Sequence, residues 1–195
     1  YEIVFGDWSA DVCSSDLRFE ADGPRLGKPD LAGLSIRLMK SHAHPGGVYI
    51  YRIEWQGLSV VYATDTEGYV GTDRRLAAFA RGADLLIHDA QYSEDHYRGL
   101  NGWMSTQGYG HSTPQMACEL ANAAGVKQLA LFHHDPNYDD ETVRQLETQA
   151  QGLFPNAFAA SEGLQVTICP KPAGAIPVAG KTEFIPSALA ADRTE

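Results

Sequence analysis

Five polar side chains in this chain lie where a catalytic or metal site would need them. Asp65, Asp89 and His133 each lie at the end of a short apolar run, Asp65 after Thr64 and Asp89 after His88, while His44 lies in HAHPGG and His111 in GYGHST. Any one of them alone is more typical of a cap or a buried hydrogen-bond partner. Imidazole and carboxylate groups with no thiolate nearby suit zinc, manganese or iron, so their joint occurrence indicates a metal-dependent site.

The first elements expected to position these side chains are strands. Alternation of Leu34, Ile36 and Leu38 with polar residues predicts a strand with one buried face. Residues 48–63 predict a hairpin that turns at Gln56-Gly57. Its aromatic residues are expected on core faces, and they are Tyr49, Tyr51 and Trp55.

Beyond residue 63, apolar runs alternate with amphipathic helices, which is typical of β-α units. Helices are expected from Thr72 or Asp73, from Thr113-Pro114 and from Asp139, and a last strand over 164–168. The carboxyl ends of strands line the ligand crevice of open α/β sheets, so the residues that follow them should converge there.

Composition excludes several classes of function. The chain has 195 residues and a formal net charge of -10, so it lacks the basic surface that grips nucleic acid without regard to sequence. It contains no apolar run of membrane-spanning length and no export signal, and we expect a cytoplasmic protein with no membrane or DNA partner. Its three cysteines form no CxxC pair.

Five segments, HPGGVYIYRIE, VVYATDTE, ADLLIHDAQY, GYGHSTPQMA and LALFHHDP, occur in an order that resembles one family. Over residues 34–168 the chain is similar to the C-terminal half of the metallo-β-lactamase fold hydrolases. The similar branch holds the RNase Z type tRNA 3′ processing enzymes and related small phosphodiesterases. The resemblance implies an α/β fold, a four-layer αββα sandwich, of which the N-terminal half is expected to be missing.

The resemblance also implies roles. His44 would be a terminal ligand of one metal ion, Asp65 would bridge two ions and His133 would be a terminal ligand of the second. His111 would protonate the leaving oxygen and be oriented by Asp89. The implied cofactors are two divalent ions, expected to be zinc, with manganese and iron as alternatives. Weaker substrate-side candidates are Trp103, Tyr109, His134 and Asp135.

Two departures from the family pattern matter. The chain has HDAQ where RNase Z enzymes usually have HEAT, which weakens the tRNA assignment. The HxHxDH motif is absent, which leaves two protein ligands for each ion where catalytic zinc sites typically have three. We therefore expect this chain to bind metal poorly and to turn over slowly or not at all, and tight binding of two zinc ions would contradict that expectation.

Three regions are expected along the chain. Residues 1–17 resemble a translated sequencing-adapter scar, and the alternative is a genuine N-terminal strand. Residues 18–169 would form the C-terminal portion of the hydrolase domain. Residues 170–195, rich in Pro, Ala and Gly, would form a flexible tail or linker.

Three functions follow from these observations. The first is a phosphodiesterase that cleaves a small or cyclic nucleotide-like substrate, because the acidic balance offers no basic arm for tRNA. The second is a tRNA 3′ processing endonuclease, and the third is a non-catalytic binding module with the same fold. The sequence leaves a homodimer open.

Overall fold

The computed structural model describes residues 2–4, 18–20, 32–68 and 72–169. The chain divides into two compact units, one made of Tyr1–Gly23 and Ser161–Glu195 and the other of Pro24–Ala160. The expected tail at 170–195 and most of the expected scar lie outside the described residues.

The first unit contains a three-stranded antiparallel sheet in the order β2-β1-β9. Its strands are β1 (Glu2–Val4), β2 (Arg18–Glu20) and β9 (Gln165–Thr167). The strand expected over 164–168 is therefore confirmed. A strand at Glu2–Val4 fits the alternative considered for the first residues, but strand pairing does not reveal where a segment comes from, and the scar stays a prediction.

The second unit is built on a six-stranded sheet in the order β3-β4-β5-β6-β7-β8. β3 pairs with β4 and β4 with β5 in antiparallel fashion, and β5, β6, β7 and β8 run parallel to one another. Gln56 and Gly57 both have positive φ, which the tight turn between β4 and β5 requires. The strands are β3 (Ser35–Ser41), β4 (Val48–Trp55), β5 (Leu58–Ala63), β6 (Leu85–Asp89), β7 (Gln128–Phe132) and β8 (Ala157–Ala159).

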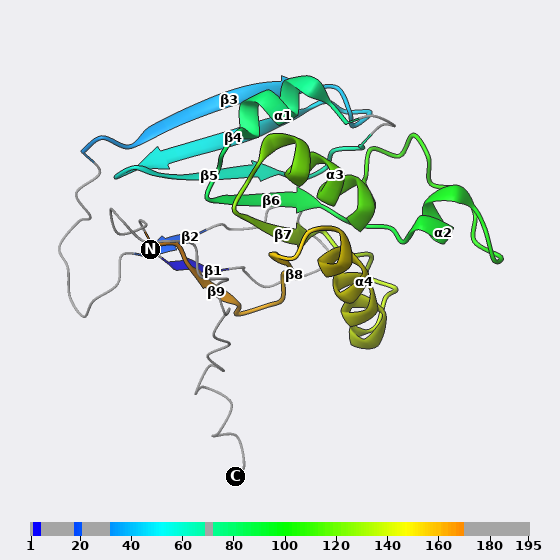
Figure 1. The fold of residues 1–195 in the computed structure, drawn as a ribbon. Coiled ribbons are helices and arrows are strands. Elements are labelled where there is room, and N and C mark those ends of the chain that lie inside the picture. The colour runs from blue at the N-terminus through cyan, green and yellow to red at the C-terminus, as the bar shows by residue number, and fades with distance from the viewer. Residues whose placement is uncertain (1, 5–17, 21–31, 69–71, 170–195) are drawn as a thin grey trace, which may run out of the picture. The chain divides into compact units, whose positions relative to one another are not determined.

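Three helices cover one face of this sheet, with α3 (Pro114–Ala124) between α1 (Arg74–Ala80) and α4 (Asp140–Leu153) (Figure 1). The expected caps are confirmed, because Asp73, Thr113 and Asp139 each accept a backbone N–H of the first turn. A short helix that the periodicity did not predict, α2 (Glu94–Arg98), lies beyond the end of the sheet to which β6 points (Figure 1).

The core lies between the helices and the sheet. From the sheet it receives Ile50, Val61, Leu86, Leu129 and Leu131, all fully buried. Among the described residues, no helix has the length and apolar character that a bilayer crossing requires.

The predicted faces of β3 and β4 are wrong. Ile36, Leu38, Tyr49 and Tyr51 are all exposed, by 37% to 57%, although they were expected to be buried. Leu38 pairs with Tyr51 across the two strands, whereas Ile36 lies opposite Ile53 and Tyr49 opposite Lys40. The opposite face, with Ile50 and Met39, packs toward the helices instead.

Arg52 explains why the alternation of residues along β4 predicted the wrong buried face. It lies on the helix side of β4 and is only 8% exposed. Its guanidinium donates to the carbonyls of Phe79 and Arg81 at the end of α1, both at 3.0 Å, and to Glu54 at 2.8 Å. A charged residue that satisfies a helix C-terminus can be buried, so its charge did not mark the solvent face.

Candidate metal centre

The strand order brings the predicted residues to one edge of the sheet. Strands β5, β6 and β7 are parallel neighbours, with Ala63 opposite His88 and Asp89 opposite Phe132. Asp65 follows β5, Asp89 ends β6 and His133 follows β7. The convergence expected from the sequence is therefore present.

Four of the five leading candidates form a compact group. Asp65, Asp89, His111 and His133 each offer one donor atom, and these atoms lie within 4.8 Å of one another. His133 Nε2 is 3.3 Å from Asp65 Oδ1, and the rings of His111 and His133 stack with centroids 4.7 Å apart. An oxygen and nitrogen donor set without a thiolate fits zinc, manganese or iron.

The backbone at two of these residues is unusual. Asp65 and His133 have φ of 50° and 66°, a left-handed conformation that costs a residue with a Cβ about 1–2 kcal/mol. Both come just after a buried parallel strand, so the sheet holds them in place. Strain of this kind concentrates at functional sites, where the surrounding structure fixes it.

Asp89 fixes the orientation of His111. Its carboxylate is buried and accepts His111 Nδ1–H at 2.8 Å, the Ser112 amide at 2.9 Å and the Gln91 amide at 3.2 Å. Because Nδ1 donates to a carboxylate, Nε2 is the nitrogen of His111 left for proton exchange. Burial lowers the pKa of His111, but the hydrogen bond and charge of Asp89, together with the charges of Asp65 and Glu67, outweigh burial, and the net pKa is raised.

His44 lies beside this group but is not one of its four members. Its ring meets His111 edge-on, with centroids 5.4 Å apart. The Gly46 amide donates to His44 Nδ1 at 3.2 Å, so a neutral ring in this geometry carries its proton on Nε2. The ring must turn, or release Gly46, before His44 can ligate a metal through Nε2.

Gly110 allows the loop of His111 to approach the loop of His44. Its φ is +96°, and a Cβ at this position would lie 2.4 Å from His44 Cδ2 and 2.8 Å from Pro45 Cδ. Only glycine fits such a close approach without a shift of backbone or ring.

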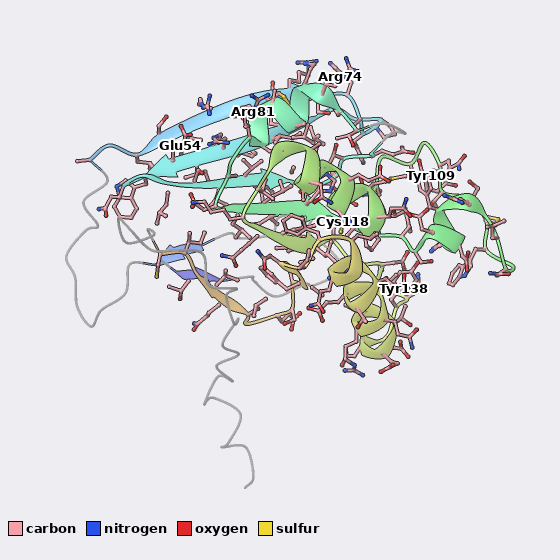
Figure 2. The ribbon with its side chains drawn as sticks, viewed as in Figure 1. Glu54, Arg74, Arg81, Tyr109, Cys118 and Tyr138 are labelled. Atoms are coloured by element: carbon pink, nitrogen blue, oxygen red, sulfur yellow. The ribbon has the colours of Figure 1, made fainter. Side chains whose placement is uncertain are left out.

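The weaker substrate-side candidates divide into two pairs. Trp103 and Tyr109 are exposed by 43% and 55%, and Trp103 stacks on His96 with centroids 4.2 Å apart. Figure 2 shows Tyr109 and Tyr138 near α2, beyond the end of the sheet. Neither Trp103 nor Tyr109 is in the four-residue group, so their contact with substrate stays a prediction.

His134 and Asp135 form the second pair, and Asp135 has a local structural role. Asp135 Oδ1 accepts the backbone and side-chain N–H groups of Asn137, both at 2.8 Å, which shapes the turn after β7. Burial lowers the pKa of His134. Their contact with substrate likewise stays a prediction.

Sequence reasoning missed Glu67. This side chain is 4% exposed and accepts hydrogen bonds from Tyr97, Gly108 and Gly110. The signal was an acidic residue two positions after Asp65, next to a strand end, where an unpaired carboxylate would be costly to bury.

Comparisons of this chain with known proteins agree on one protein family. The family described as "Beta-lactamase superfamily domain" matches residues 20–134. A ribonuclease Z of Synechococcus sp. (strain CC9311) is 38% identical over 120 residues, which is 60% of this chain and 35% of that protein. The chain thus spans about a third of the length of this curated relative.

Solved structures agree on the fold. The metallo-beta-lactamase fold protein YhfI from Bacillus subtilis matches with a TM-score of 0.56 at 24% identity, over 76% of this chain and 54% of that one. Human tRNase Z, short form, matches with a TM-score of 0.53 at 19% identity, over 70% of this chain and 44% of that one. At these identities the likeness concerns the fold alone, and it confirms the metallo-β-lactamase fold predicted from the sequence.

Proposed function

The chain belongs to the beta-lactamase superfamily, and on that basis we propose that it carries part of the catalytic site of a metal-dependent phosphodiester hydrolase. The observation that carries the proposal is the group formed by Asp65, Asp89, His111 and His133. Its donor atoms come from three parallel strand ends and one glycine-rich loop, all at a single edge of the sheet.

Asp65 and His133 are the residues proposed to hold metal, where Asp65 would serve both ions, His133 would bind one and His44 would bind the other. Zinc is the proposed ion, with manganese and iron as alternatives that the same donors accept. Divalent ions held here would supply hydroxide near neutral pH and would stabilise charge on the phosphoryl oxygens. Asp89 is engaged by three hydrogen-bond donors and is proposed to orient His111 rather than to ligate.

His111 is the proposed general acid. Asp89 holds its Nδ1–H, so the proton delivered to the leaving oxygen would come from Nε2. Its raised pKa keeps a larger fraction of the ring protonated near neutral pH, as this role requires. A phosphodiester suits this arrangement because cleavage leaves an alkoxide that must be protonated.

The relatives change the order of the two substrate classes. Composition alone favoured a small or cyclic nucleotide, since the net charge is -10. The 38% identical relative is a ribonuclease Z, and the family match over residues 20–134 includes the proposed site residues, so the 3′ end of tRNA becomes the first substrate to test. The small phosphodiester remains the second candidate on the strength of the acidic composition. We rank a non-catalytic module last because the proposed site residues are present.

The experiment compares two substrates with the full-length gene product that contains this chain. Pre-tRNA with a 3′ trailer and a cyclic mononucleotide are assayed with added zinc or manganese, and His111→Gln is the matched variant. We expect cleavage of pre-tRNA and a loss of about 100-fold or more in His111→Gln. Cleavage of neither substrate, or full activity in the variant, would contradict the proposal.

A further inference from the structure

Glu67 lies where three loops of the proposed site meet. Its backbone N–H donates to the Ala43 carbonyl at 3.2 Å, in the loop that carries His44. Its carboxylate Oε1 accepts the Gly108 amide at 2.8 Å, and Oε2 accepts the Gly110 amide at 3.1 Å. Residue 67 itself is two positions beyond Asp65. One residue thus connects the loops that carry three of the proposed site side chains.

The carboxylate of Glu67 also bonds outward to helix α2. Tyr97 Oη donates to Glu67 Oε1 at 2.7 Å, and Tyr97 is itself buried. The Tyr97 carbonyl accepts the Thr106 amide at 3.3 Å and the Ser105 hydroxyl at 3.0 Å, at the start of the loop that ends in His111. Both ends of this loop are therefore tied to Glu67, directly or through Tyr97.

A simple core role does not account for this arrangement. The partners of the carboxylate are two backbone amides of one glycine-rich loop and one hydroxyl, and no cation bonds to it within the described part of the chain. Backbone amides of a loop have no helix or strand to satisfy them, so a buried acceptor fixes the loop conformation. Gly110 at the same time contacts the ring of His44, where even a Cβ would clash.

We propose that Glu67 is a positioning residue that holds the 105–110 loop in place, so that the His111 ring stacks on the His133 ring and lies beside the His44 ring. The inference rests on the proposed function only for the role it gives His111. The loop conformation itself can be tested without metal or substrate.

The test uses Glu67→Gln in the metal-free chain, with amide hydrogen exchange read residue by residue. A glutamine keeps the shape but replaces one acceptor oxygen with an NH2 group. Whichever way the amide turns, either Gly108 or Gly110 loses its acceptor. We expect at least one of these two amides to exchange about tenfold faster, while core amides such as those of Leu86 and Leu129 keep their wild-type rates.

A second readout follows the two rings. The His44 and His111 rings, with centroids 5.4 Å apart, are close enough for a nuclear Overhauser contact. We expect this contact to weaken in Glu67→Gln and in any other variant that lacks the carboxylate. Asp73→Asn is the matched control, because Asp73 is an acidic helix cap on α1 that does not bond to this loop. Wild-type exchange at both glycines, or equal acceleration of glycine and core amides, would overturn the proposal.

Tyr97→Phe keeps the test decisive if Glu67→Gln does not fold. It removes one donor to the carboxylate and leaves the ring in place. We expect exchange at Gly108 or Gly110 to rise at least threefold, and unchanged rates would overturn the proposal. These measurements do not depend on hydrolysis, so a failure to cleave either substrate would count against the proposed function and not against the role of Glu67.

Discussion

At the scale of single residues, Asp89 and His111 carry the most specific chemistry in the chain. Asp89 is fully buried and its oxygens are used by three donors, which makes it a rigid acceptor for His111 Nδ1. Two opposing influences act on the pKa of His111. Burial is the largest single influence and lowers this pKa, while the hydrogen bond and charge of Asp89, with the charges of Asp65 and Glu67, together raise it above its ordinary value.

This balance predicts the effect of Asp89→Asn. Removal of the charge leaves burial as the main influence, so the pKa of His111 should fall from above its ordinary value to below it. Nuclear magnetic resonance titration of the His111 ring in the metal-free chain measures the change. Asp84→Asn is the matched control, because Asp84 is a buried aspartate just before the same strand β6, which Asp89 ends. A His111 pKa that stays raised in Asp89→Asn would contradict this account of the site.

At the scale of elements, the parallel part of the sheet could be predicted and the antiparallel part only in outline. Short apolar runs followed by Asp65, Asp89 and His133 predicted both the strands and their convergence, because parallel strands end at one edge. In β3 and β4 both faces carry apolar residues, and the buried Arg52 mimicked a solvent-facing residue. Periodicity could not choose between such faces.

The elements that were missed are short or depend on distant partners. Helix α2 has five residues and strand β8 three, too few for a hydrophobic period to show. The role of Glu67 depends on amides 41 and 43 positions later in the chain. No local pattern contains that information, which appears only when the loops are folded together.

Helix α3 offers a test of element stability. Thr113 is fully buried, accepts the Met116 amide at 3.3 Å and donates to Glu94 at the start of α2. Thr113→Ala should lower the free energy of unfolding by about 1–2 kcal/mol, because it removes an N-cap and leaves Glu94 without this donor. Urea unfolding measures the loss. Gln115→Ala, an exposed change in the same helical turn, should stay within about 0.5 kcal/mol of wild type, and equal losses in the two variants would contradict the capping role.

At the scale of the whole molecule, two histidines make stability depend on pH. Burial lowers the pKa of His88, against a smaller raising effect of the hydrogen bond with the Asp89 carbonyl, and burial also lowers the pKa of His134. The unfolded chain then binds more protons than the folded one as pH falls through the ordinary histidine range. The contribution of these two histidines to the free energy of unfolding should therefore be retained above about pH 6.5 and be lost below it. His111, whose pKa is raised, acts in the opposite sense, because its smaller contribution is lost as the pH rises.

Urea unfolding at pH 7.5 and pH 5.5 measures this dependence. We expect wild type to be less stable at pH 5.5, and His88→Leu to show a smaller difference between the two pH values. His42→Gln is the control, because His42 is exposed and should leave the difference unchanged. Equal pH dependence in wild type and His88→Leu would show that His88 does not titrate on unfolding.

The central claim is that Asp65 and His133, just beyond the ends of strands β5 and β7, form the metal-binding part of a hydrolase site. Calorimetric titration of zinc into the metal-free chain tests it most directly, with Asp65→Asn beside Glu141→Gln, an exposed acid on α4. We expect weak but saturable binding by wild type, an affinity at least tenfold lower in Asp65→Asn, and no change in Glu141→Gln. Absence of saturable binding, or equal affinity in wild type and Asp65→Asn, would contradict the claim.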